Sequence, residues 1–194
     1  MRKVICAMNV SLDGYIEGAN GELDWIENWE DSYGLMEQVD TCVLGAAMYP
    51  GYEQFWSTVL AAPGLPLPFT GKPATQGEID YAKFTQRTPH VVLSKSLTST
   101  GWKTTCFVRE LNDIARLKQQ PGKDIYAVGG ATLVASLIEQ GLVDELRLAI
   151  HPVLLGRGKA LFKPSPKRHK LVLAKTRSQP WGTVELTYRL EAAE

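Results

Sequence analysis

Short apolar runs separated by turn-forming residues recur along the chain and predict a series of buried strands. These runs cover residues 3–10, 41–45, 90–94, 104–108, 125–128 and 146–150. Between them, apolar residues at helical spacing predict helices over 30–39, 47–60 with a break near Pro50-Gly51, 75–87, 110–119 and 132–140. Residues 170–176 and 184–190 pair naturally as a C-terminal antiparallel hairpin. Strands that alternate with helices and end in a hairpin predict an α/β fold with a mostly parallel central sheet and an antiparallel edge.

Three segments between these elements predict loops. Residues 12–28 carry turn chemistry and are expected to form a long loop. Residues 61–74, AAPGLPLPFTGKPA, are too rich in proline and glycine for regular structure, and we expect a surface loop that covers a site. The sequence GRGK, residues 156–159, is typical of a flexible basic loop that touches a cofactor or a substrate phosphate.

Composition narrows the classes of protein to consider. The 194 residues suit one domain, 1–194, with a substantial core. Lys+Arg and Asp+Glu both number 21, so the chain has no basic excess for a nucleic acid. No apolar run is long enough to span a membrane. The cysteines Cys6, Cys42 and Cys106 form no C-x-x-C pair, and the scattered histidines show no metal-ligand spacing. We therefore expect a reduced cytoplasmic protein without a metal site.

Small and polar residues follow three of the predicted strands. Gly129 and Gly130 end one strand just before a helix, Gly45 ends another, and Ser94-Lys95-Ser96 follows a third. Ligands of open α/β sheets bind at the carboxyl ends of strands, and a helix start suits a phosphate. An ordinary tight turn explains each motif equally well when it is taken alone, and the third glycine of G-x-G-x-x-G is absent.

Taken together, the motifs resemble a known family. VICAMNVSLDGYI, GELDW, TCVLG, VVLSKSL and YAVGGATL…GLVDELRLAIHPVLLGRGKALF occur in the order found in the dihydrofolate-reductase-like family. The chain is most similar to small bacterial proteins related to the reductase domain of the riboflavin-biosynthesis deaminase/reductase. The likeness runs from Lys3 to about Leu190 and is most specific over 128–162. It implies a three-layer dihydrofolate-reductase-like fold, an NADPH-dependent oxidoreductase and a homodimer.

The resemblance also implies where NADPH binds. Ala7 and the Asp13-Gly14-Tyr15-Ile16 loop would flank the nicotinamide. Gly45, Ala46 and Ala47 would lie near the adenosine, and Ser94, Lys95 and Ser96 near the 2′-phosphate. Val128, Gly129, Gly130, Ala131, Thr132 and Leu133 would pass against the cofactor and donate to its pyrophosphate. In dihydrofolate reductases the paired glycines are joined by a cis peptide bond.

The chain departs from the family at two positions. Relatives carry Arg-x-Thr after the glycine of VLG, whereas this chain has Ala46-Ala47-Met48, which leaves Lys95 as the local cation for a 2′-phosphate. Folate reductases hold their substrate with a carboxylate beyond the loop tryptophan. Counting from Trp25 selects Glu30, and a single gap moves the match to Asp31 or Glu27. Solvated charges at a helix start are the alternative explanation.

For the substrate, the candidates are Asn9, Trp25, Tyr49 and His151, although a structural histidine explains His151 equally well. The expected reaction is hydride transfer from NADPH to a small heterocyclic or ribosylaminopyrimidine-type substrate. One alternative is the reductase of riboflavin biosynthesis that acts on 5-amino-6-(5-phosphoribosylamino)uracil, with Lys72, Arg157 or Lys159 holding the phosphate. Another is a non-catalytic nucleotide-binding or dimerisation module. The zinc-deaminase signature is absent.

Overall fold

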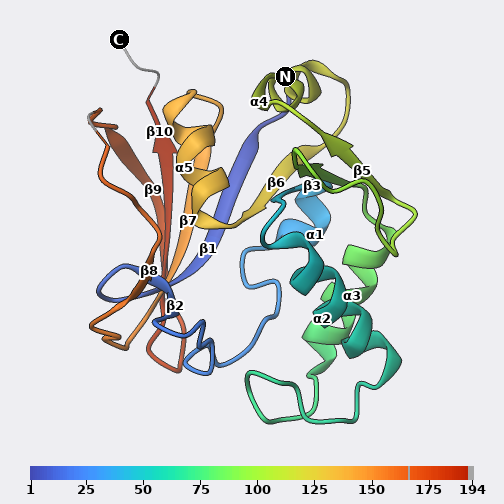
Figure 1. Ribbon diagram of the computed structural model, residues 1–194. Coiled ribbons are helices and arrows are strands. Elements are labelled where there is room, and N and C mark those ends of the chain that lie inside the picture. The colour runs from blue at the N-terminus through green and yellow to red at the C-terminus, as the bar shows by residue number, and fades with distance from the viewer. Residues whose placement is uncertain (166, 192–194) are drawn as a thin grey trace.

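The computed structural model, which describes residues 1–165 and 167–191, is built around an eight-stranded sheet (Figure 1). Its strands are β1 (Val4–Ser11), β3 (Val39–Gly45), β4 (His90–Leu93), β5 (Thr105–Val108), β6 (Asp124–Gly129), β7 (Glu145–His151), β9 (Leu171–Ser178) and β10 (Val184–Leu190). They lie in the order β5-β4-β3-β6-β1-β7-β10-β9. The first six are parallel, and β10 and β9 are antiparallel. The predicted fold class is confirmed.

Helices cover both faces of the sheet and make a three-layer fold. They are α1 (Leu35–Gln38), α2 (Tyr49–Ala61), α3 (Gln76–Arg87), α4 (Leu111–Gln119) and α5 (Ala131–Glu139). Apolar side chains of α1, α2 and α3 pack with Ile5 and Ala7 of β1 on one face. Those of α4 and α5 pack with Val4, Cys6 and Met8 on the other. Because successive side chains of a strand point to opposite faces, β1 is apolar throughout most of its length.

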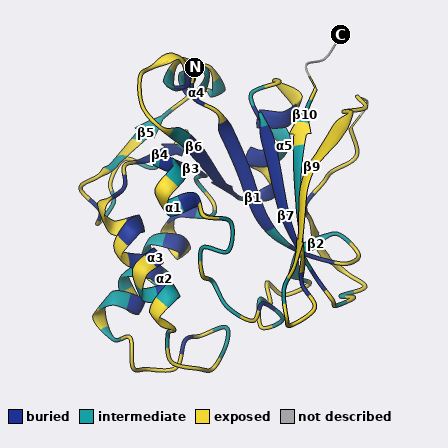
Figure 2. Ribbon diagram, turned by 180° about the vertical axis from the view of Figure 1, so that it is seen from behind, coloured by how far each residue is buried: buried dark blue, intermediate teal, exposed yellow. Residues whose placement is uncertain are grey.

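Burial follows this layering (Figure 2). Strands β1 and β7 are buried in the middle of the molecule, whereas β9 is exposed along its whole length. Burial raises the pKa of the Cys6 thiol to about 12 and also raises the pKa of Cys42. These two cysteines therefore behave as small apolar core residues. No helix within the described residues has the length and apolar character needed to cross a membrane.

Two of the predicted helices differ from those observed. Helix α1 has only four residues instead of spanning 30–39, because Gly34 adopts a left-handed conformation with φ of 69° and ends a turn that starts at Asp31. Helix α2 runs without the break predicted near Pro50. Proline is tolerated there because it lies in the first turn, where its missing N–H has no partner to lose. Helix α3 begins with a capping box formed by Thr75 and Glu78.

The segment predicted as one long loop, 12–28, contains the short strand β2 (Tyr15–Gly18). This strand pairs with β8 (Gly158–Ala160) in a two-stranded antiparallel sheet, so the second half of GRGK, Gly158 and Lys159, belongs to a sheet. Asp13 fixes this region: its carboxylate accepts the N–H groups of Leu155 at 3.2 Å and Gly156 at 2.7 Å. The hydroxyl of Ser11 also donates to it, and this bond is the main reason why the Asp13 pKa is lowered.

The proline-rich segment 61–74 is irregular, as predicted, but its own backbone orders it. The amide of Leu67 donates to the carbonyl of Lys72 at 2.8 Å, and that of Ala74 to Pro63 at 3.1 Å. The side chain of Leu67 is buried in the core formed with α2 and α3. The loop is therefore held against the helices, which positions its aromatic residue, Phe69, next to Trp29 and to Phe55 of α2.

Candidate active site

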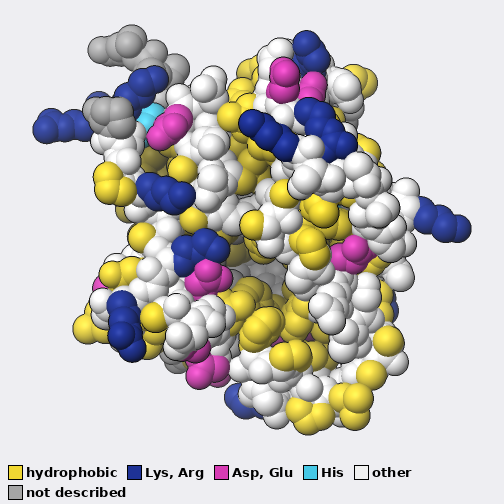
Figure 3. All heavy atoms as spheres, in the orientation of Figure 1, with side chains coloured by type: hydrophobic (Ala, Val, Ile, Leu, Met, Phe, Trp, Pro, Cys, Tyr) yellow, Lys and Arg dark blue, Asp and Glu magenta, His cyan; other side chains and the backbone are white. Residues whose placement is uncertain are grey.

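A cavity of about 660 Å³ opens beyond the carboxyl ends of the central parallel strands. It lies between the sheet on one side and α2 with the proline-rich loop on the other. Figure 3 shows this hollow, with hydrophobic side chains along its border. Each central strand contributes to the lining: Ala7 and Asn9 from β1, Gly45 from β3, Val128 from β6 and His151 from β7. This is the position at which open α/β sheets bind ligands.

The start of helix α5 forms one wall of the cavity. Gly130, Ala131, Thr132 and Leu133 line it, and no side chain caps the helix. The first backbone hydrogen bond of the helix runs from the Val134 N–H to the Gly130 C=O. The N–H groups before Val134 therefore have no acceptor within the helix. The peptide bond between Gly129 and Gly130 is cis, as the resemblance implies. A helix start with free amides on a cavity wall is a site for an anion.

A lysine that the sequence analysis did not select lies beside this helix start. Nζ of Lys163 donates to Oγ1 of Thr132 at 3.3 Å, although the two residues are 31 positions apart. The nearest hint in the sequence is its place directly after ALF, the end of the motif shared with the family. The helix dipole and this ammonium group favour negative charge at the same point.

The glycine pair shows why small residues are needed at this point. A Cβ on Gly129, whose φ is 132°, would approach the sulfur atoms of Met8 and Met48 to 3.3 Å. A Cβ on Gly130 would meet nothing within 4 Å. Gly129 is therefore packed into the structure and does not line the cavity, whereas Gly130 faces open space.

The Ser94-Lys95-Ser96 motif lies just outside the cavity, beyond Leu93, which lines it. Ser94 is buried, and its hydroxyl oxygen accepts the amides of Ser96 at 3.2 Å and Leu97 at 2.8 Å. Lys95 and Ser96 are exposed. The residue before the motif, Leu93, is tied to the cavity wall, because its carbonyl accepts the Ala46 amide at 3.1 Å. Ala46 and Ala47 also line the cavity and offer no cation to it.

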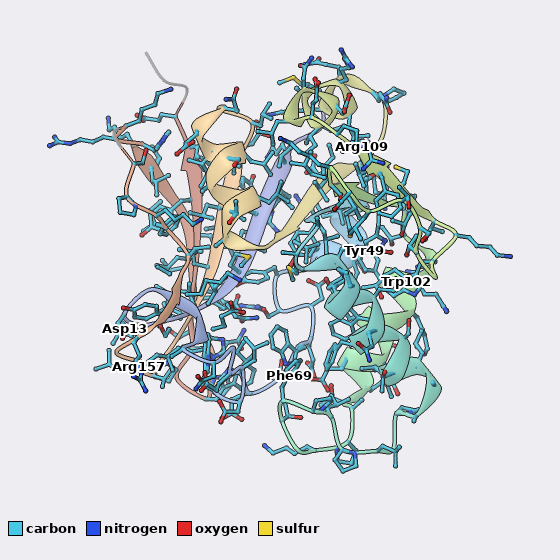
Figure 4. The ribbon with its side chains drawn as sticks, viewed as in Figure 1. Asp13, Tyr49, Phe69, Trp102, Arg109 and Arg157 are labelled. Atoms are coloured by element: carbon cyan, nitrogen blue, oxygen red, sulfur yellow. The ribbon has the colours of Figure 1, made fainter. Side chains whose placement is uncertain are left out.

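Arg109 supplies a second cation at this edge (Figure 4). It follows β5 directly, and its Nη1 donates to the carbonyls of Ser94 at 2.5 Å and Leu97 at 3.0 Å. The sequence analysis missed this residue, although its place at the carboxyl end of a strand was a usable signal. Lys95 and Arg109 together put two positive charges where the resemblance implies a 2′-phosphate.

Of the predicted Asp13–Ile16 loop, only Ile16 lines the cavity. The Asp13 carboxylate accepts the Gly156 amide, and Figure 4 shows Asp13 near Arg157 and well apart from Phe69. Gly14 accepts the amide of Leu161 at 3.0 Å, and the amide of Tyr15 donates to the Ser11 hydroxyl at 2.9 Å. Asp13, Gly14 and Tyr15 therefore hold the loop in place through hydrogen bonds and do not line the cavity.

The two candidate acids both line the cavity but have different partners. The carboxylate oxygens of Asp31 accept the amides of Leu35 at 2.8 Å and Met36 at 2.7 Å, so Asp31 caps α1. Oε1 of Glu30 accepts the hydroxyl of Thr75 at 2.7 Å. Asp31 is therefore an acid at a helix start, as the alternative explanation holds, although backbone amides of α1 and not solvent satisfy its carboxylate.

Among the substrate candidates, Asn9 and His151 form a pair inside the cavity. Nε2 of His151 lies 2.9 Å from Oδ1 of Asn9, and Nδ1 lies 3.4 Å from the hydroxyl of Thr183. Burial lowers the pKa of His151. Trp25 is not part of the lining, but its ring meets His151 edge-on with centroids 5.3 Å apart.

Tyr49 does not reach the cavity. Its ring is buried on the other side of α2, edge-on to Trp102 with centroids 6.4 Å apart, as Figure 4 illustrates. Its hydroxyl is within hydrogen-bond distance of Thr100 at 2.8 Å and Thr105 at 2.7 Å. The prediction of a substrate contact for Tyr49 is therefore wrong: the residue opens α2 with its ring turned into the core.

Other aromatic residues do line the cavity, at the end nearest α2 and α3. Trp29, Phe55 and Phe69 surround one another with centroid distances of 6.3, 6.1 and 5.4 Å. Tyr52, Trp56 and Tyr81 continue this wall. No local pattern in the sequence marks Phe69 or Tyr81 as facing a cavity. No group of histidine, cysteine or acidic residues in the described part of the chain is arranged to hold a metal ion.

This sheet, with its site at the strand ends and its cis glycine pair, has the dihydrofolate-reductase-like fold. Dihydrofolate reductase from Enterococcus faecalis, in its complex with NADP(H) and RAB-propyl, shares this fold with a TM-score of 0.56 at 15% identity, covering 98% of this chain and 97% of that one. A putative riboflavin biosynthesis protein from Shewanella sp. PV-4 has a TM-score of 0.73 at 24% identity, with coverage of 98% and 99%.

The chain belongs to the RibD C-terminal domain family, whose model matches residues 2–184. YyaP of Bacillus subtilis strain 168 is 34% identical over 191 residues, which is 96% of this chain and 94% of YyaP. These matches confirm the resemblance that the motifs suggested. The family and the structural neighbours are reductases.

Proposed function

We propose that the protein is an NADPH-dependent reductase that delivers hydride to a C=N or C=O group of a small heterocyclic substrate. The observation that carries this proposal is the uncapped start of α5 on the cavity wall, directly after the last strand residue of β6. Its free amides match the pyrophosphate of a dinucleotide. Membership of the RibD C-terminal domain family and the shared fold with an NADP(H)-binding dihydrofolate reductase support the same conclusion.

The donors present fit this cofactor along its whole length. The amides of Ala131 to Leu133, with Lys163, would hold the pyrophosphate. The adenosine would lie against the small residues Gly45, Ala46 and Ala47. The 2′-phosphate would be bound by Lys95 and Arg109. Ala7 and Ile16 would flank the nicotinamide, which supplies the hydride when the cofactor is bound.

The remaining side chains of the cavity act on the substrate. Asn9 and His151 form a fixed polar pair that orients the heterocycle, while the aromatic end excludes water from it. Hydride addition to a C=N group leaves a nitrogen that must be protonated. We assign delivery of that proton to Glu30, because Asp31 uses both carboxylate oxygens to hold α1 whereas Glu30 faces the cavity with only one oxygen bound to Thr75.

Calorimetric titration with NADPH and with NADH tests the nucleotide site. The two nucleotides differ only in the 2′-phosphate, so Lys95→Ala and Arg109→Ala should each weaken NADPH about tenfold and leave NADH unchanged. Lys163→Ala should weaken both nucleotides, because it faces the part that they share. Lys170→Ala removes an exposed lysine next to β9 and is the matched control. Failure of both nucleotides to bind the unaltered protein would refute the proposal.

Binding alone does not show turnover, so a second measurement follows oxidation of NADPH at its absorbance band in the presence of candidate heterocycles. The proposal predicts substrate-dependent oxidation that falls in Glu30→Gln with little change in the affinity for NADPH. NADPH binding without oxidation by pteridines or ribosylaminopyrimidines would favour a non-catalytic nucleotide-binding module on the same fold.

A further inference from the structure

We infer that the substrate of this protein is a flat aromatic heterocycle that carries no phosphate group and is neutral or positively charged. The inference rests on the proposed function, because the cofactor takes the α5 side of the cavity and leaves the aromatic side to the substrate. It separates this chain from a reductase of phosphoribosylaminopyrimidines, although the family is named for riboflavin biosynthesis. Three features of the described structure carry it: the charges that line the cavity, the partners of the nearby cations, and the aromatic end.

The charges lining the cavity are mostly negative. Five carboxylates line it, against the single ammonium group of Lys159; they belong to Glu17, Glu27, Glu30, Asp31 and Glu185. Lys159 pairs with Glu17 and Arg177 pairs with Glu185, so within the described structure the carboxylates without a close cationic partner are the other three. Three of the five lie in the short segment 27–31, beside Trp29 at the aromatic end. A phosphate group brought there would meet like charges and would lose its hydration without a compensating cation. An N–H group or a protonated ring nitrogen would instead find acceptors.

The cations expected from the sequence to hold a substrate phosphate are not available for it. Nζ of Lys159 lies 2.7 Å from a carboxylate oxygen of Glu17. Lys72 is exposed, and its ammonium is 3.9 Å from Glu27. Arg157 is not among the lining residues, and Figure 4 shows it near Asp13 and well apart from Phe69. None of the three presents an uncompensated charge to the aromatic end.

A second cavity of about 400 Å³ does contain clustered cations, namely Arg147, Lys175 and Arg177. Both arginines are already paired within the sheet. Arg147 donates to the Glu145 carboxylate at 2.7 Å, and Arg177 donates to Glu185 through Nε at 2.8 Å and Nη2 at 3.0 Å. A phosphate that displaced these partners would leave buried carboxylates unpaired, which is costly. Lys175 alone is left, at the exposed strand β9.

The aromatic end favours a flat ring. Trp29 from the loop before α1, Phe55 from α2 and Phe69 from the proline-rich loop each present part of a ring to the cavity while they pack on one another. Aromatic side chains stack on or meet planar heterocycles edge to face and release water from both surfaces. A hydrated phosphoribosyl group gains nothing from such a wall. Charge and shape therefore select the same class of ligand.

The test compares matched ligands on the NADPH-loaded protein by fluorescence titration. The ligands are 2-amino-4-oxopteridine, 5-amino-6-ribosylaminouracil and its 5′-phosphate, of which the last two differ only in the phosphate. The inference predicts that the phosphate-free ribosyl compound binds at least about tenfold more tightly than the phosphorylated one, and the flat pteridine more tightly still. Equal or tighter binding of the phosphorylated compound overturns the inference, as does failure of the pteridine to bind.

Two variants link the result to the residues named. Phe69→Ala should weaken the pteridine about tenfold, whereas Leu65→Ala, an exposed residue of the same loop that does not line the cavity, should leave it unchanged. In Glu27→Gln/Glu30→Gln the preference for the phosphate-free compound should shrink several-fold. NADPH binding is measured separately on each protein. Failure of the unaltered protein to bind NADPH would refute the proposed reductase, whereas intact NADPH binding with the opposite ligand preference would refute only this inference.

Discussion

Acidification should destabilise the protein through one buried histidine, His90. This residue lies on β4 with no exposed surface, and its ring packs against Trp102 with centroids 5.0 Å apart. Nδ1 is 2.7 Å from the Thr88 carbonyl, and Nε2 is buried without a hydrogen-bond partner in the described structure. A positive charge there would lose its hydration. Burial accordingly lowers the pKa of His90 from 6.5 to about 4.

The sign and size of the effect follow from linkage. Because the folded pKa lies below the unfolded one, the stabilisation is fully present above the unfolded value of 6.5 and is lost as the pH falls toward about 4. Between about pH 7.5 and about pH 5, protonation of the unfolded chain lowers the free energy of unfolding by about 2 kcal/mol through this residue alone. His90→Leu keeps an apolar side chain in the core and removes the titration.

Urea denaturation at both pH values measures the effect. The loss of stability on acidification should be about 2 kcal/mol smaller in His90→Leu than in the unaltered protein, whatever the absolute stability of the variant. Groups such as His151, whose pKa burial also lowers, titrate in both proteins and cancel in the comparison. The same acid loss in His90→Leu and the unaltered protein would refute the argument.

Three further predictions concern stability, reactivity and local order. Glu78→Ala removes a buried carboxylate that accepts two backbone amides, so urea denaturation should show a free energy of unfolding lower by about 1–2 kcal/mol. The exposed control Asp80→Ala should lower it by less than about 0.5 kcal/mol. Equal losses in the two variants would contradict the capping role of Glu78. A thiol reagent should modify only Cys106 in the folded protein and all three cysteines in urea, and a second reactive thiol in the folded protein would contradict the core described above. The Ser11 hydroxyl is the main group that lowers the pKa of Asp13 in the folded protein. The stabilisation by the Asp13 carboxylate is therefore present above its unfolded pKa and is lost as the pH falls through its folded pKa. Asp13→Asn should therefore speed hydrogen exchange at the Gly156 amide at neutral pH, and unchanged exchange would refute this role.

Most strands were predictable because their signal is local. An apolar run such as residues 125–128 predicts a buried strand whatever lies around it, and β1, β3, β4, β6 and β7 all carry such runs. Helix α1 was overestimated for an equally local reason. The apolar spacing over 30–39 is helical, but Gly34 takes a left-handed conformation, and the helix begins only at Leu35, whose amide Asp31 accepts.

The site was less predictable, because its residues meet through the fold. The glycine pair and the start of α5 were identified from the sequence, since a strand-to-helix junction is contiguous. Lys163, Arg109 and Phe69 were not, because each approaches the cavity or its edge through partners distant in the sequence. Tyr49 is the opposite case, a residue that was expected to line the cavity but lies in the core. An aromatic residue at the start of a helix can point either to the cavity or to the core, and the pattern of α2 does not decide between them.

The most direct test of the central claim is a crystal structure of the protein with NADPH. The account predicts the pyrophosphate on the amides of Ala131 to Leu133, the 2′-phosphate between Lys95 and Arg109, and the nicotinamide beside Ala7. NADPH bound elsewhere, or an empty cavity at NADPH concentrations well above the dissociation constant measured by calorimetry, would contradict it.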